Sequence, residues 1–223
     1  MYAYLLYYIL GFVMIPGIFL GIYAQIRVNS TFNKFNSIST SRGRTAKEVA
    51  RAMLNGGNCY DTQINEISGD LTDNYNPKTD IVSLSESVAN HSTIAAIGVT
   101  AHEVGHVFQH KQNYIPVKVR SALVPVLNVS SFFMWPLIII GLIFEVAYVA
   151  TWATALIYIG LGIYALNTLF CLITLPVELN ASKRAYNMLI ATNELSEDEA
   201  NSAKKVLNAA AWTYVAALIT SIF

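Results

Sequence analysis

The chain of 223 residues is 54% hydrophobic and only 13% charged, and its mean hydropathy of +0.45 lies well above the usual range of a water-soluble domain. Its 14 Lys and Arg balance its 14 Asp and Glu, and a net charge of zero excludes the basic surface that nucleic-acid binding requires. The two cysteines lie in different settings, Cys59 in a polar segment and Cys171 in an apolar run, which excludes a disulfide-based scaffold.

Four apolar runs are long enough to cross a bilayer, which takes about 20 residues as a helix. They cover residues 3–25, 122–144, 152–176 and 206–223. The first run has no charge before Arg27 and lacks the basic start and small-residue cleavage site of a signal peptide, so we expect a retained anchor. The sequence therefore predicts a mainly α-helical, polytopic membrane protein with about four transmembrane helices.

The basic residues indicate how such a protein is oriented. All 14 of them fall in the two polar segments between the runs, residues 26–120 and 177–205. Because loops rich in Lys and Arg stay in the cytoplasm, both segments are expected there and both termini outside. We expect one membrane-embedded domain over residues 1–223, with a small α+β portion on the cytoplasmic side.

The larger polar segment contains signals for short elements. Residues 28–43, rich in Ser, Asn and Thr, predict an irregular linker. A Thr-x-x-Glu capping box then predicts a helix over 46–54. Residues 62–68 and 80–84 carry β-branched or alternating side chains and predict two or three short strands, with a turn at 74–77.

A further helix, expected to begin near Ser92, carries the stretch AHEVGHVFQH with three of the four histidines. His102 and His106 lie one turn apart on one face, so both rings can bind one ion, and Glu103 lies at the edge of that face. This is the H-E-x-x-H pattern of zinc hydrolases. A helix with two buried histidines and a glutamate is the alternative, but burying three polar groups without a shared partner is costly.

A catalytic zinc site takes a third protein ligand. His110 lies about 12 Å along the helix from His102, which is too far for a shared ion, and we expect it to be a helix-end residue. Glu178 is expected to open a polar helix where an apolar run ends, and there it could face the histidines. It could equally be an interfacial anion at a helix N-terminus, and the spacing leaves both interpretations open.

Several motifs together resemble one known family. They are LTDNYNP, VSLSESV, STIAA, AHEVGHVFQH and LPVELNASKRA, and they resemble the YugP-type neutral zinc metallopeptidases, bacterial membrane proteins similar to the gluzincins. The resemblance covers nearly the whole chain. It implies a zincin-like cytoplasmic portion, a location in the bacterial inner membrane, zinc as cofactor with His102, His106 and Glu178 as ligands, and Glu103 as general base.

The expected function is an integral-membrane endopeptidase that hydrolyses a peptide or membrane-protein substrate at the cytoplasmic face of the lipid bilayer. A zinc-activated water would attack the peptide carbonyl, with Glu103 accepting its proton. Arg184 and Tyr75 are candidates for stabilising the oxyanion, and Ser182 and Asn180 for orienting the ligands.

Two further expectations accompany this interpretation. Residues 80–86 are expected to offer an exposed strand edge on which an extended substrate could pair. A non-catalytic membrane scaffold or adaptor that keeps the zinc pocket as structure is the alternative function. An intramembrane protease of the site-2 type is disfavoured, because its H-E-x-x-H lies inside a span whereas a long polar segment precedes the motif here.

Overall fold

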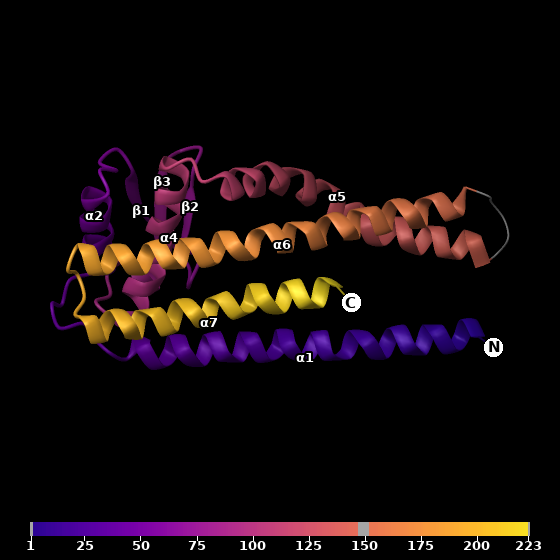
Figure 1. Ribbon diagram of the computed structural model, residues 1–223, viewed down its shortest axis with the longest axis horizontal. Coiled ribbons are helices and arrows are strands. Elements are labelled where there is room, and N and C mark those ends of the chain that lie inside the picture. Colours follow the sequence, from indigo (N-terminus) through magenta and orange to yellow (C-terminus); the bar gives the residue numbers. More distant parts are fainter. Residues whose placement is uncertain (1, 147–151, 223) are drawn as a thin grey trace.

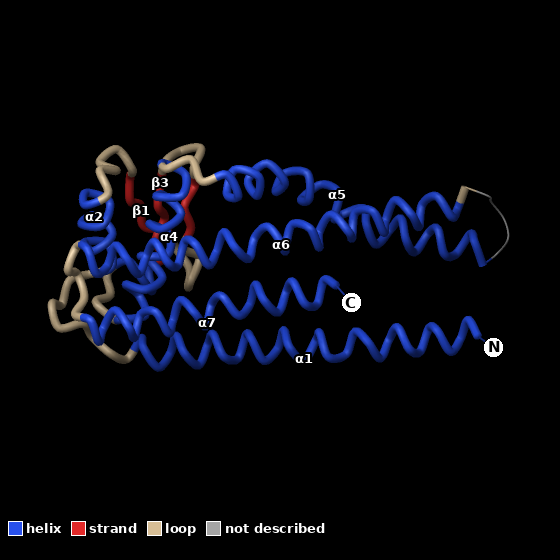
Figure 2. Tube along the Cα trace, viewed as in Figure 1, coloured by secondary structure: helices blue, strands red, loops and turns tan. Residues whose placement is uncertain are grey.

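The computed structural model describes residues 2–146 and 152–222, with side chains for 15–146 and 152–222. Four long helices run along the longest axis of the molecule (Figure 1), namely α1 (Tyr2–Asn36), α5 (Ile115–Val146), α6 (Ala153–Ala191) and α7 (Glu197–Ile222). The other elements gather at one end of these helices, and are α2 (Ala46–Gly56), β1 (Gln63–Ile67), β2 (Asn74–Asn76), β3 (Ile81–Ser85), α3 (Glu86–Ala89) and α4 (Ile94–Lys111). The chain is therefore mainly helical, with one small sheet (Figure 2).

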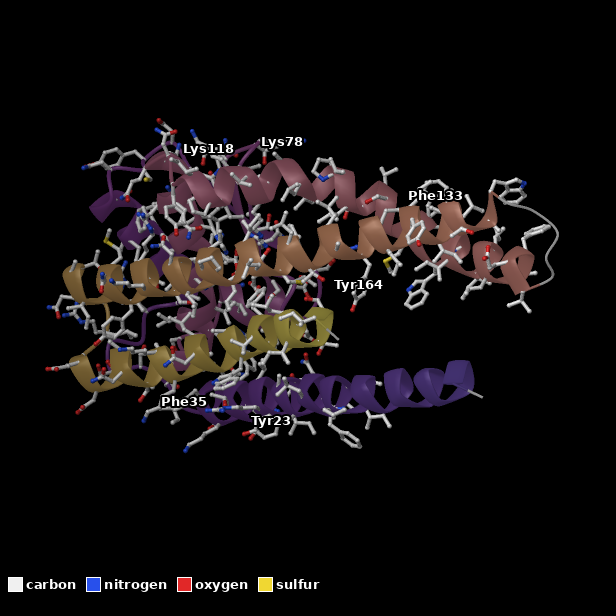
Figure 3. All side chains as sticks on the ribbon, turned by 45° about the vertical axis from the view of Figure 1, so that its right-hand side comes forward. Tyr23, Phe35, Lys78, Lys118, Phe133 and Tyr164 are labelled. Carbon is white, nitrogen blue, oxygen red and sulfur yellow. The ribbon has the colours of Figure 1, made fainter. Side chains whose placement is uncertain are left out.

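Three helices of the described part, α5, α6 and α7, are long and apolar enough to cross a membrane. Their most apolar windows are only 11%, 6% and 28% buried inside the molecule, so apolar side chains cover the outer surface, as contact with lipid requires. Phe133 and Tyr164 lie on this helical part, whereas Lys78 and Lys118 lie nearer the end with the sheet (Figure 3).

The fourth expected span, residues 3–25, lies within α1. The side chains of its residues 3–14 fall outside the described part of the chain, as does residue 223 of the last expected span. The three spans over α5, α6 and α7 are therefore supported by length and composition, and the span over α1 stays a prediction.

The helix ends follow local capping signals. The capping box of Thr45 and Glu48 is present at the start of α2, which ends at Gly56, two residues beyond the expected 46–54. Ser196 and Glu199 exchange the corresponding hydrogen bonds at the start of α7. The N-cap of α4 is Thr93, whose hydroxyl accepts from the amide of Ala96, and not Ser92 as expected.

The expected linker over residues 28–43 is wrong in its first half, because α1 continues to Asn36. Phe32 and Phe35 are buried in the hydrophobic core at the end of the molecule that contains the sheet. This burial keeps the segment helical despite its Asn and Ser residues. Tertiary packing commonly overrides a weak local propensity in this way.

The sheet has the strand order β1-β3-β2, in which β3 is parallel to β1 and antiparallel to β2. The expected exposed edge at residues 80–86 is therefore wrong, since β3 pairs on both sides and its Val82 and Leu84 are fully buried. Of the expected turn at 74–77, residues 74–76 instead form β2, an outer strand of the sheet, and the turn follows over residues 77–80.

α4 is buried along most of its length between α2, α6 and α7. It lies close against α6 at Gly105, where an added Cβ atom would lie 2.4 Å from the carbonyl oxygen of Ala181. No side chain larger than hydrogen fits at that separation. Gly105 therefore sets how closely the histidine-bearing helix lies against α6.

We predict that Gly105→Ala lowers the free energy of unfolding by about 1–3 kcal/mol, because the new methyl group forces α4 away from α6. Thermal unfolding of the purified protein in detergent measures the loss. Gly162→Ala is the matched control, since Gly162 lies in α6 with nothing within 4 Å of its Cβ position. Equal stability of the two variants would contradict the steric argument.

Candidate metal centre

Glu178 lies inside a helix and not at its start. α6 runs without a break through Pro176 to Ala191, and the side chain of Glu178 is only 2% exposed. The interpretation of Glu178 as an interfacial anion at a helix N-terminus is therefore wrong. Continuation of α6 past Pro176 carries this carboxylate to the histidine-bearing face of α4.

His102, His106 and Glu178 converge on one point. Oε2 of Glu178 lies 3.0 Å from Nε2 of His102 and 3.4 Å from Nε2 of His106. One ligand atom from each of the three residues lies within 4.8 Å of the others, a group that could hold a metal ion. Ligands about 2 Å from a tetrahedral zinc ion lie roughly 3.3 Å apart, so the distances of 3.0 and 3.4 Å from Glu178 to the two histidines fit zinc.

Each histidine ring is held through its Nδ1 atom, one by a residue of α6 and the other by a residue of α4. Nδ1 of His102 lies 3.1 Å from the hydroxyl oxygen of Ser182, one turn after Glu178 on α6. Nδ1 of His106 lies 2.9 Å from Oε1 of Gln109 on its own helix. Both Nε2 atoms are thereby directed at Glu178, as outer contacts commonly direct metal-binding imidazoles.

Gln109 also fixes which nitrogen of His106 carries the proton. Its amide nitrogen donates to the carbonyl of Val177 at 2.7 Å and to Oδ1 of Asn180 at 3.1 Å, so its oxygen is left to accept from Nδ1 of His106. In the neutral ring, Nε2 then presents a lone pair to the carboxylate of Glu178. Two electron-pair donors facing each other at 3.4 Å repel unless a proton or a metal ion lies between them, and two imidazoles with one carboxylate are a common donor set for catalytic zinc.

Glu103 is adjacent to both histidines and lines the same cavity. Burial raises the pKa of its carboxyl group above the usual range, and the neighbouring carboxylate of Glu178 raises it further, while His102 and His106 act in the opposite direction. Such a carboxyl group binds a proton more readily than an exposed one, as suits a proton acceptor.

The centre opens into a cavity of about 450 Å³. Its walls come from α1, β2, α4, α5, α6 and α7. One part is apolar and is formed by α1 and α7 together with one residue of α4, namely Val28, Phe32, Val99, Val206, Leu207, Ala210 and Ala211. The other part is polar and includes β2. The cavity is large enough for several side chains of an extended peptide.

The remaining predicted residues fall in two groups. Ser182 and Tyr75 line the cavity, although the hydroxyl of Tyr75 donates to Asp80 at 3.0 Å. Asn180 and Arg184 lie behind the centre, where Nε of Arg184 donates to Oδ1 of Asn180 at 2.7 Å. Asn180 in turn accepts from Gln109, so both residues act on His106 only through that side chain.

His110 lies in the last turn of α4, as expected for a helix-end residue, but it also takes part in the cavity wall. It lines the cavity, and its ring packs edge-on against Tyr75 with centroids 5.6 Å apart. Burial lowers the pKa of its imidazole below the usual value, which favours the neutral ring.

Three residues at the centre were missed by the sequence analysis. Gln109 follows His106 at i+3, a helical spacing that could have indicated the contact. Arg120 was considered only as a topology signal, yet it contacts Glu178. Tyr214 lines the cavity from α7, and no sequence signal distinguishes it from the other tyrosines.

Comparison with known proteins gives consistent results. The model of a family described as "Putative neutral zinc metallopeptidase" matches residues 10–223. A protein of Bacillus subtilis (strain 168), named "Putative membrane protease YugP", is 39% identical over 214 residues, which are 95% of this chain and 91% of that protein. A search of solved structures finds none that matches.

We predict that Gln109→Met weakens zinc binding about 10–100-fold, the usual cost of removing a group that orients a metal ligand. Methionine fills the same space, but it leaves Nδ1 of His106 without an acceptor. Competition with a chromophoric chelator measures the affinity. Gln63→Met, at an exposed position of β1, is the control, and an unchanged affinity in Gln109→Met would show that this hydrogen bond does not hold the ring.

Proposed function

We propose, from the premise that this chain belongs to the neutral zinc metallopeptidase family, that it is an integral-membrane zinc-dependent endopeptidase. His102, His106 and Glu178 would bind the zinc ion, and Glu103 would act as general base. The observation that carries the proposal is the convergence of two oriented imidazoles and one buried carboxylate in a cavity lined by a further carboxylate. A zinc ion, when bound, acts as a Lewis acid towards water and a peptide carbonyl.

The residues of the chain perform the remaining tasks. Ser182 and Gln109 hold the two imidazoles in fixed orientations. Glu103 accepts the proton of the attacking water and delivers it to the amine that leaves when the peptide bond breaks. The apolar walls from α1 and α7 exclude bulk water and bind apolar side chains of the substrate.

The position of the cavity supports a substrate at the membrane surface. Its lining residues Val28, Arg120 and Val206 lie at or within a few residues of the ends of the expected spans 3–25, 122–144 and 206–223. A peptide bond in this cavity therefore lies close to the level where the helices leave the bilayer. We propose juxtamembrane segments or loops of membrane proteins as substrates, cleaved on the cytoplasmic side.

We predict that Glu103→Gln lowers the rate of proteolysis about 10²–10⁴-fold, which is the usual contribution of a general base, while zinc binding is retained. Cleavage of β-casein by the purified full chain, with zinc content measured in parallel, tests both parts. Glu86→Gln, an exposed substitution of the same type in α3, should be fully active.

Two outcomes of this experiment would contradict the proposal. Unchanged cleavage by Glu103→Gln would refute the role of Glu103 as base. A wild-type protein that binds one zinc ion but cleaves nothing would favour the non-catalytic scaffold.

We predict that a membrane-impermeant maleimide labels Val146→Cys but not Lys78→Cys in intact cells, in a background with Cys59 and Cys171 replaced by alanine. Val146 is 75% exposed at the end of α5, and Lys78 is exposed near the sheet, at the end proposed to be cytoplasmic. Inverted vesicles should give the opposite pattern. Labelling of Lys78→Cys in intact cells would reverse the orientation.

A further inference from the structure

The two carboxylate oxygens of Glu178 have different surroundings. Oε2 faces Nε2 of both histidines, at 3.0 and 3.4 Å. Oε1 faces Arg120 instead, whose Nη2 lies 3.1 Å away. This distance is that of an ion pair, although within the described part of the chain Oε1 accepts no hydrogen bond of good geometry. One oxygen is thus directed at the histidines, and the other at a guanidinium group.

Arg120 comes from a different part of the fold than the three converging residues. It lies in the second turn of α5, which begins at Ile115, and its side chain is 28% exposed and lines the cavity. Its Nε atom is buried without a hydrogen-bond partner in the described part. Lys118, two residues earlier on the same helix, is exposed, so the two basic residues differ clearly in their surroundings.

The burial of Glu178 explains why a cation is needed there. An ionised carboxylate with 2% exposure loses several kcal/mol of hydration unless a charge or hydrogen bonds replace the water. Arginine stays protonated at every physiological pH, so Arg120 places a permanent positive charge 3.1 Å from Oε1, the oxygen that does not face the histidines.

The contact also determines how the carboxylate is presented. Attraction between Arg120 and Oε1 opposes rotation of the carboxylate about its terminal bond, a rotation that would bring both oxygens towards the histidines. Removing the guanidinium would leave Oε1 free to turn into the centre. The orientation of the Glu178 carboxylate therefore depends on this contact from α5.

We propose that Arg120 is a positioning residue of the metal centre, which holds Oε1 of Glu178 through its 3.1 Å contact and thereby presents the other oxygen, Oε2, to the ion. The inference rests on the proposed function in one respect, the binding of a metal ion by His102, His106 and Glu178. It adds a residue of α5 to Ser182 and Gln109, the groups that orient the three proposed ligands.

Zinc affinity of the full chain in detergent, measured by competition with a chromophoric chelator, tests the proposal. Arg120→Ala should bind zinc about 10–100-fold more weakly, the range found when a group that orients a ligand is removed. Arg120→Lys keeps the charge without the planar fork and should fall between Arg120→Ala and wild type. Lys118→Ala, the matched control, makes the same change in net charge on the same helix and should bind zinc as wild type does.

The cobalt(II)-substituted protein gives a second readout that is independent of activity. If Oε1 turns into the centre in Arg120→Ala, the visible absorption of cobalt changes in position and intensity, whereas Lys118→Ala retains the wild-type spectrum. Circular dichroism verifies that each variant is folded. Should Arg120→Ala not fold, Arg120→Lys carries the same two measurements.

Wild-type zinc affinity and cobalt absorption in a folded Arg120 variant would overturn the inference. A raised KM for β-casein with unchanged metal binding would overturn it as well, and would place Arg120 on the substrate instead. These outcomes are distinct from failure of the proposed function, in which the wild-type protein either binds no zinc or binds it without cleaving protein.

Discussion

The close contact between α4 and α6 is the constraint on which the rest of the centre depends. Successive turns of the two helices meet in opposite chain directions, first at His102 and Ser182, then at Gly105 and Ala181, and then at His106 and Glu178. The contact that holds His102 and the third converging group, Glu178, therefore derive from one helix–helix interface. A shift of one helix by a single turn, about 5.4 Å, would separate all these pairs together. The glycine between the two histidines permits this approach, since any other residue would collide with the backbone of α6.

The histidine pair could be predicted from sequence because its geometry is local. His102 and His106 are separated by one helical turn wherever the helix lies, and the helix itself follows from its apolar pattern and a nearby cap. Glu178 was a different case, since the residues alone left two interpretations open and only the resemblance to a family favoured one. What decides between them is the continuity of α6 through Pro176, which the sequence does not reveal because proline usually ends or kinks a helix.

The errors in the predicted fold have a common physical origin. Residues 28–36 carry the composition of a loop, yet they are helical because Phe32 and Phe35 pack into the core. Asn74 and Asn76 are typical turn residues, yet they flank Tyr75 in a strand because β3 offers a pairing edge. β3 was expected at an edge, but its order in the sheet depends on β2, whose formation the composition concealed. In each case a contact between residues far apart in the sequence decided the local structure. The local composition, rich in polar residues, did not predict that contact.

The contact from Arg120 to Glu178 connects the metal centre to α5, one of the helices long and apolar enough to cross a membrane. The three converging residues come from α4 and α6, and the ion-pair partner of Glu178 comes from α5. The apolar part of the cavity wall comes mainly from α1 and α7. Each of these helices except α4 extends away from the sheet along the longest axis (Figure 1). A fragment restricted to residues 37–114 would retain both histidines and Glu103 but would lose Glu178, Arg120 and the apolar walls. The helices long and apolar enough to cross a membrane, α5, α6 and α7, are thus also elements that complete the centre, so the centre cannot form without them.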